Sequence, residues 1–146
     1  MLSILIVEDH LMIADQVEAC LLDNGYSVCG IASDVLSGLA LYQLHKPDLV
    51  ILDLRLAHGD LGTAMAAQLP PSDHVGILYV TGSSCEFALL NEDGHACLSK
   101  PYVHADLLRS LSVVFDLIAT GKATPPFPRG FHLLNPALTA HPTVPS

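Results

Sequence analysis

Five polar residues at the ends of short apolar runs carry the side chains best suited to chemistry in this sequence: Glu8, Asp9, Asp53, Thr81 and Lys100. Three carboxylates cannot lie together unaided, because two unit charges about 4 Å apart repel by roughly 4 kcal/mol at an effective dielectric of about 20. A hard divalent cation relieves that repulsion, and Mg²⁺ suits a site that also holds phosphate. Asp53 is then the expected nucleophile, forming an acyl phosphate. Thr81 and Lys100 are expected to stabilise the transferring oxygens.

The runs that precede these residues predict a parallel β-sheet. Leu2–Val7, Leu49–Leu52 and Ile77–Val80 are apolar almost throughout, which is typical of strands buried on both faces. Two weaker strands fit Tyr26–Ile31 and Ala96–Leu98. All the polar residues above then lie at the carboxyl ends of parallel strands, the edge at which open α/β sheets bind ligands.

Helical patterns separate the predicted strands. They cover Leu11–Leu21, Val35–His45, about Leu61–Leu69, Cys85–Asp93 and about Val103–Ala119. Strand and helix alternate five times, which predicts an open, doubly wound α/β sheet with helices on both faces.

The acidic pair, the aspartate, the threonine and the lysine-proline pair, in this order and spacing, resemble the signature of response-regulator receiver domains over about residues 1–119. The resemblance implies a flavodoxin-like fold with a five-stranded parallel sheet, strand order 2-1-3-4-5, and five helices. It implies Asp9, Asp53 and the main-chain carbonyl of Arg55 as Mg²⁺ ligands, with Glu8 acting through water. It also implies a cis peptide bond at Lys100-Pro101.

Two features depart from the family pattern. Many receivers carry an aromatic switch residue three positions before the lysine, where this chain has Cys97; Tyr102 is the candidate substitute. The loop after Asp53 lacks a frequent proline, and Arg55 is expected to project beside the phosphate and alter the lifetime of the acyl phosphate.

The expected function is signalling by a stand-alone receiver. Asp53 accepts a phosphoryl group from a histidine kinase or phosphotransfer protein, and the signal passes through altered protein–protein contacts. On this hypothesis the chain is no enzyme beyond its own phosphorylation and dephosphorylation.

Three alternatives remain open. An aspartyl-nucleophile phosphohydrolase of the haloacid dehalogenase kind needs a second acid two residues after the nucleophile, where this chain has Arg55. A flavodoxin-type cofactor binder needs a Ser/Thr/Gly-rich phosphate loop in place of Glu8-Asp9-His10. The chain is also compatible with a receiver fragment whose effector domain has been removed.

Charge and composition exclude other classes. All 15 acidic residues but only four of the six basic ones lie before Gly121, giving that part a formal charge of −11, which disfavours nucleic-acid binding. No run reaches the roughly 18 apolar residues of a membrane span, and the amino terminus does not read as a signal peptide, so a cytoplasmic protein is expected. The four cysteines form no C-x-x-C pair and are expected as reduced thiols rather than metal ligands.

The carboxyl-terminal part differs in composition. Six of the ten prolines fall in Pro125–Pro145, which predicts a receiver domain over residues 1–121 and a proline-rich tail over 122–146. Leu108, Phe115 and Val103 widen the apolar stripe of the last helix. This stripe is expected to pack under the neighbouring helix, or to dock a partner, a second copy or the chain's own tail. The resemblance implies a homodimer through the face of helix 4, strand 5 and helix 5.

Overall fold

The computed structural model describes residues 1–82 and 89–140. Its centre is a six-stranded sheet with the order β2-β1-β3-β4-β5-β6. The strands are β1 (Ser3–Val7), β2 (Ser27–Ala32), β3 (Leu49–Asp53), β4 (Gly76–Thr81), β5 (Ala96–Ser99) and β6 (Phe131–Leu133). The first five pair in parallel and β6 is antiparallel to β5. The predicted strand order 2-1-3-4-5 is confirmed, but the predicted count of five strands is wrong because a sixth follows.

The central strands are buried on both faces, as their unbroken apolar sequences predict. Successive side chains of a strand point to opposite faces, so Ile4 and Ile6 contribute to one core and Leu5 and Val7 to the other. β3 and β4 are divided between the two cores in the same way.

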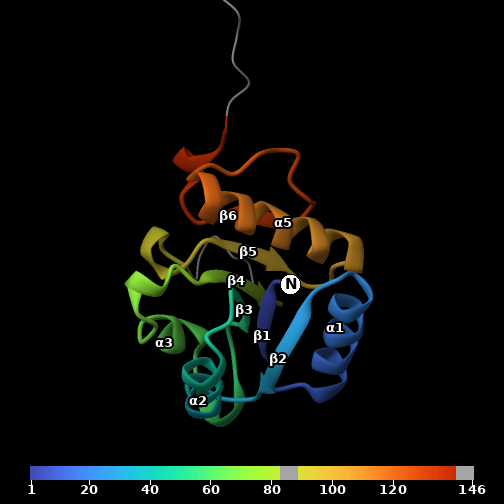
Figure 1. Cartoon of the computed structure of the whole chain (residues 1–146), viewed down its shortest axis with the longest axis vertical. Coiled ribbons are helices and arrows are strands. Elements are labelled where there is room, and N and C mark those ends of the chain that lie inside the picture. Colours follow the sequence, from blue (N-terminus) through green and yellow to red (C-terminus); the bar gives the residue numbers. More distant parts are fainter. Residues whose placement is uncertain (83–88, 141–146) are drawn as a thin grey trace, which may run out of the picture.

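Helices cover both faces of the sheet (Figure 1). The core on one face includes residues of α1 (Leu11–Asp23) and α5 (His104–Thr120), and the core on the other includes residues of α2 (Val35–His45) and α3 (Gly62–Ala66). This arrangement is the predicted doubly wound, flavodoxin-like one.

The number and length of the helices differ from the prediction. The described residues contain four α-helices rather than five. Of the predicted helix over Cys85–Asp93, the first four residues lie outside the described part, Leu89 and Leu90 are not helical, and Asn91–Asp93 is a 3-10 turn. α3 is shorter than Leu61–Leu69 because its last turn tightens: the amides of Gln68 and Leu69 donate to carbonyls three residues back.

Residues 122–140, called the C-terminal strap below, are folded against the domain. The strap contains β6 and a 3-10 turn, Pro136–Leu138, and its residues Ala123 and Phe131 are buried in the core that α1 and α5 share. Figure 1 shows the strap in orange to red beside α5. Phe127, Phe131 and Leu133 of the chain's own tail pack in the core to which α5 contributes, as one of the alternatives predicts, whereas Leu134 belongs to the core on the opposite face. The division of the chain at residue 121 stays a prediction, but the described part of the tail extends the sheet.

Two further expectations concern the oxidation state of the cysteines and the absence of membrane-spanning helices. Cys20 and Cys29 are free thiols, whereas Cys97 is disulfide-bonded, so the expectation of a reduced thiol is wrong at that position. Within residues 1–82 and 89–140, no helix combines the length and apolar character that crossing a membrane requires.

Candidate functional site

The carboxyl ends of four parallel strands bring the candidate residues to one edge of the sheet. β1 runs into Glu8 and Asp9, β3 ends at Asp53, β4 ends at Thr81, and Lys100 follows β5. The register aligns the ends of neighbouring strands, because Thr81, the last residue of β4, pairs with Ser99, the last residue of β5. The amide of Lys100 then donates to the carbonyl oxygen of Thr81 over 2.7 Å.

Lys100 joins the two buried carboxylates of the site. Its Nζ lies 3.0 Å from Asp53 Oδ2 and 3.2 Å from Glu8 Oε1, across 47 and 92 positions of the sequence. Glu8 and Asp53 are 3% and 8% exposed, so water screens these pairs poorly. The peptide bond after Lys100 is cis, as the resemblance implies.

The loop after β3 holds Asp53 from the other side. The amide of Arg55 donates to Asp53 Oδ1 over 3.2 Å, so each carboxylate oxygen has a donor. The Arg55 side chain is exposed. Thr81 is buried beside this edge, with 2% of its surface exposed.

The charges of the site shift two pKa values. Burial, together with a hydrogen bond and charge repulsion from Asp53, raises the pKa of Glu8 to about 8, although Lys100 opposes the shift. Burial alone would lower the pKa of Lys100, but hydrogen bonds and attraction from Asp53 and Glu8 outweigh it, so the pKa of the ammonium is raised. The ammonium of Lys100 therefore stays charged. Because this ammonium alone offsets the carboxylates among the described residues, the carboxyl group of Glu8 stays protonated up to about pH 8.

The site has the donor set of a divalent cation. Glu8, Asp9 and Asp53 each offer a carboxylate oxygen, and these atoms all lie within 4.8 Å of one another. Glu8 Oε2 is buried and has no hydrogen-bond partner within the part of the chain that the structure describes. Hard oxygen ligands and an unpaired buried oxygen fit Mg²⁺.

Gly62 is a residue of the site that the sequence does not single out. It begins α3, and its amide donates to the carbonyl of Leu54 over 2.8 Å. A Cβ at this position would collide with the main-chain oxygen of Asp53. Only the absence of a side chain lets α3 pass this close to the end of β3.

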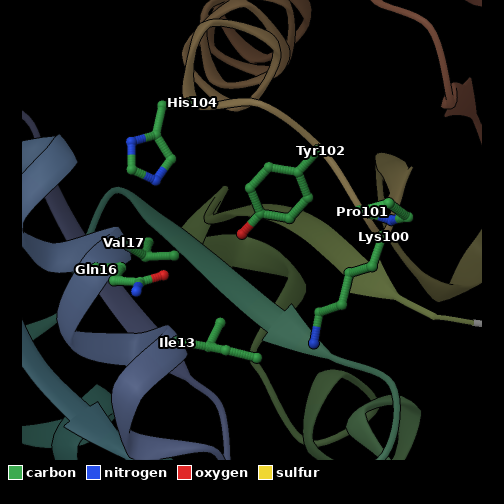
Figure 2. Close-up of a pocket in the computed structure, with 7 residues that line it drawn as sticks. All are labelled: Ile13, Gln16, Val17, Lys100, Pro101, Tyr102 and His104. Carbon is green, nitrogen blue, oxygen red and sulfur yellow. The ribbon is translucent and has the colours of Figure 1, made fainter.

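A cavity of about 480 Å³ opens beside Lys100, between α1 and the segment that leads into α5. Figure 2 shows Tyr102 projecting into this space, opposite Ile13, Gln16 and Val17 of α1. Burial raises the pKa of Tyr102 to about 12, so its hydroxyl stays protonated. The proposed role of Tyr102 as a substitute switch residue stays a prediction.

A mainly parallel sheet with an acidic edge, at which a lysine pairs with Asp53 and Glu8, defines the class of protein. The sequence matches the response regulator receiver domain over residues 4–112, and the chain belongs to that family.

Individual relatives agree with this assignment. The transcriptional regulatory protein PdtaR of Mycobacterium tuberculosis is 29% identical over 113 residues, which are 75% of this chain and 55% of PdtaR. The chain thus spans about half the length of the curated relatives it matches.

Solved structures share the fold. A CheY-like receiver domain protein from Methanospirillum hungatei is 29% identical with a TM-score of 0.73, covering 83% of this chain and 98% of that one. NtrX from Brucella abortus has a TM-score of 0.74 at 23% identity, covering 83% of this chain and 29% of that one. At that identity the likeness to NtrX shows the fold alone.

Proposed function

We propose that this chain accepts a phosphoryl group on Asp53 and passes the signal on through altered protein–protein contacts. The observation that carries the proposal is the Lys100 ammonium lying 3.0 Å from Asp53 Oδ2 beside the buried Glu8. A carboxylate held by a lysine and flanked by two further acids suits transfer of a phosphoryl group to the aspartate.

The proposed donor is the phosphohistidine of a histidine kinase or a histidine phosphotransfer protein. An oxygen of Asp53 forms a bond to phosphorus while the bond from phosphorus to the imidazole nitrogen breaks, and the imidazole takes a proton from water. Lys100 and the hydroxyl of Thr81 contact oxygens of the transferring group and stabilise its charge. Arg55 holds Asp53 Oδ1 through its amide, which orients the attacking carboxylate.

The proposed cofactor is Mg²⁺. Asp9, Asp53 and the main-chain carbonyl of Arg55 would be direct ligands, and Glu8 would bind through water. The cation supplies charge neutralisation on the phosphoryl oxygens and lets the carboxylates stay ionised together. The fit of the carboxylate cluster and the unpaired Glu8 Oε2 support this assignment.

Exposed apolar side chains beside the site support a protein as the phosphodonor. Leu11 and Met12 begin α1, next to the acidic pair, and are 65% and 68% exposed, so they offer apolar contacts to a phosphodonor protein. A homodimer through the face of the predicted fourth helix, whose first residues lie outside the described part of the chain, with β5 and α5 is a second proposal, although β6 already pairs with β5. The acidic body disfavours nucleic acid, and we place the protein in the cytoplasm.

An aspartyl phosphohydrolase is the less favoured function. That chemistry needs a carboxylic acid two residues beyond the nucleophile to protonate the leaving group. Arg55 occupies this position with its side chain exposed. We therefore propose a signalling receiver and not an enzyme that acts on small molecules.

The experiment is incubation with Mg²⁺ and acetyl phosphate, followed by intact mass spectrometry. Wild type is expected to gain one phosphoryl group that is stable in acid and labile in base, and Asp53→Ala none. Asp15→Asn is the matched control, because this exposed acid of α1 changes charge outside the site and should leave the gain intact. Equal phosphorylation of Asp53→Ala and wild type would exclude Asp53 as the acceptor.

A further inference from the structure

The C-terminal strap lies on the strand that carries Lys100. β6 pairs with β5 through Ala96–Leu133, Cys97–His132 and Leu98–Phe131. Two hydrogen bonds extend this pairing at its ends: the amide of Ser99 donates to Gly130 over 2.9 Å, and that of Leu134 donates to His95 over 3.1 Å. The strap therefore follows β5 along its whole length.

Two consecutive amides hold the end of β5 from opposite sides. The Ser99 amide donates outward to the carbonyl of Gly130 in the strap, and the Lys100 amide donates inward to the carbonyl of Thr81 in β4. The main chain that carries the Lys100 side chain is thus held between the strap and β4. One of these two contacts belongs to a segment outside the matched family region, which ends at residue 112.

Arg109 fastens the strap to α5. Its Nε donates to the carbonyl of Pro126 over 3.1 Å and its Nη2 to that of Thr124 over 2.8 Å. The strap is also closed on itself, since the amide of Ala123 donates to Leu138 and that of Ala140 donates back to Ala123. The two hydrogen bonds from Arg109 come from one side chain, so a single substitution removes both and loosens the strap.

We propose that the strap is a positioning element of the phosphoacceptor site, which fixes the end of β5 so that Lys100 meets Asp53. This inference rests on the proposed function. A small displacement of a charged group that stabilises a transition state lowers the rate strongly. Arg109 and Gly130 act through the strap: Arg109 donates to the carbonyls of Thr124 and Pro126, and the carbonyl of Gly130 accepts from the amide of Ser99.

A strap that has no role in positioning Lys100 predicts different results for the same substitutions. A strand that only covers the edge of β5 would protect the sheet from pairing with other chains. Loosening such a cover would change stability or association and leave the phosphorylation chemistry of the folded protein unchanged. The phosphorylation rate separates the two roles. The Mg²⁺ affinity tests for a wider disturbance of the site, because Glu8, Asp9 and Asp53 lie at the ends of β1 and β3, away from the strap.

Two substitutions in the full chain loosen the strap by different means. Arg109→Ala removes both hydrogen bonds to the strap. Gly130→Ala acts on the main chain, because Gly130 has φ +81°, whereas the three atoms nearest the added Cβ all belong to Ser99 and lie 3.6 Å or more away. Each change should raise the fraction of undocked strap about five- to thirtyfold.

The chain offers a matched control for each variant. Lys122→Ala also removes one positive charge from this region, and its side chain has no hydrogen bond or ion pair within the described part of the chain. Gly25→Ala imposes the same main-chain strain at φ +87°, in the turn after α1, where nothing lies within 4 Å of the added Cβ. Arg109→Lys tests rescue, since lysine keeps the charge and can restore one hydrogen bond.

The rate of phosphorylation by acetyl phosphate at saturating Mg²⁺ is the first readout. Arg109→Ala and Gly130→Ala are expected to phosphorylate about three- to tenfold more slowly than wild type. Their Mg²⁺ affinity by calorimetry should stay within about twofold. Arg109→Lys should be intermediate and both controls should match wild type. Strap variants that fold and phosphorylate at the rate of their controls would overturn the inference.

Hydrogen exchange tests the reciprocal effect: if docking of the strap favours binding of a phosphoryl mimic, thermodynamic linkage requires the mimic to favour docking of the strap. Beryllofluoride with Mg²⁺, a phosphoryl mimic, is expected to slow exchange at the Ser99 and Leu134 amides in wild type and not in Asp53→Ala. Unchanged exchange at both amides on mimic binding would contradict the inference. If wild type neither gains a phosphoryl group nor binds the mimic, the proposed function itself fails, which is a different outcome.

Discussion

Replacing Glu8 by glutamine in a magnesium-free buffer should change how stability depends on pH. The pKa of Glu8 is raised by burial and by Asp53 to about 8, against an ordinary value of 4.5. The folded state therefore binds a proton that the unfolded state has released. This contribution to stability is fully present below the unfolded pKa and is lost as pH rises through the folded pKa.

The magnitude follows from the window between the two pKa values. Where the group is protonated in the folded state and ionised in the unfolded state, the free energy of unfolding falls by about 1.4 kcal/mol for each unit that the pH rises. Between pH 5 and 8 this would reach about 4 kcal/mol, but Lys100 is partly exposed and can relax around the carboxylates. We expect about half, so wild type should lose about 2 kcal/mol relative to Glu8→Gln over this range.

Urea unfolding followed by far-ultraviolet circular dichroism at pH 5, 6, 7 and 8 measures the difference. Glu92→Gln is the control, because it removes the same charge from an exposed position and should run parallel to wild type. Saturating Mg²⁺ should flatten the wild-type dependence, because a metal favours the deprotonated ligand. A constant difference between wild type and Glu8→Gln across the range would refute the electrostatic reasoning.

Three further predictions concern the scaffold of the site. Tyr42→Phe removes a buried hydroxyl that donates to Asp73 over 2.6 Å, and should lower the free energy of unfolding by about 1–2 kcal/mol in urea titrations. Gly62→Ala should lower the thermal midpoint and slow phosphorylation at least threefold, since a Cβ there collides with the main-chain oxygen of Asp53; wild-type values for both would show that α3 shifts freely. The imidazole of His95 accepts a hydrogen bond from a β4 amide, and burial lowers the pKa of His95. The stability that the neutral imidazole contributes is therefore present above its ordinary pKa of about 6.5 and is lost as the pH falls below that value. His95→Asn should keep the acceptor and lose this acid sensitivity, whereas retained sensitivity in calorimetric melts would exclude His95 as its source.

The sheet was predictable from the sequence because its central strands are buried on both faces. Leu49–Asp53 and Gly76–Thr81 are apolar nearly throughout, and each ends in a polar residue that emerges at the edge. Parallel pairing then brings the ends together without any knowledge of loop structure. The pairing of Lys100 with Asp53 and Glu8 follows from the same geometry.

β6 was not predictable in the same way. Phe131–Leu133 is only three residues long and lies among prolines and Gly130, a composition that indicates a tail. Its strand character comes from pairing with β5, more than thirty residues earlier, and from the burial of Phe131. Tertiary contacts of this kind override local propensity.

Gly62 and Cys97 show a second limit. A glycine after a turn is common, so its close approach to Asp53 becomes visible only when α3 is placed against the sheet. The disulfide of Cys97 depends on proximity between segments, and no spacing motif in the sequence indicates it. Patterns along the chain predict elements, whereas close approaches between elements depend on the packed structure.

Reduction of the phosphorylated protein with borohydride, followed by peptide mass mapping, most directly tests the central claim that Asp53 is the acceptor. An acyl phosphate on Asp53 should be reduced to the alcohol, which changes the mass of residue 53. The same treatment without acetyl phosphate also reduces the disulfide of Cys97 but should leave residue 53 unchanged. Reduction at Glu8, Asp9 or any other acidic residue, with Asp53 intact, would contradict the claim.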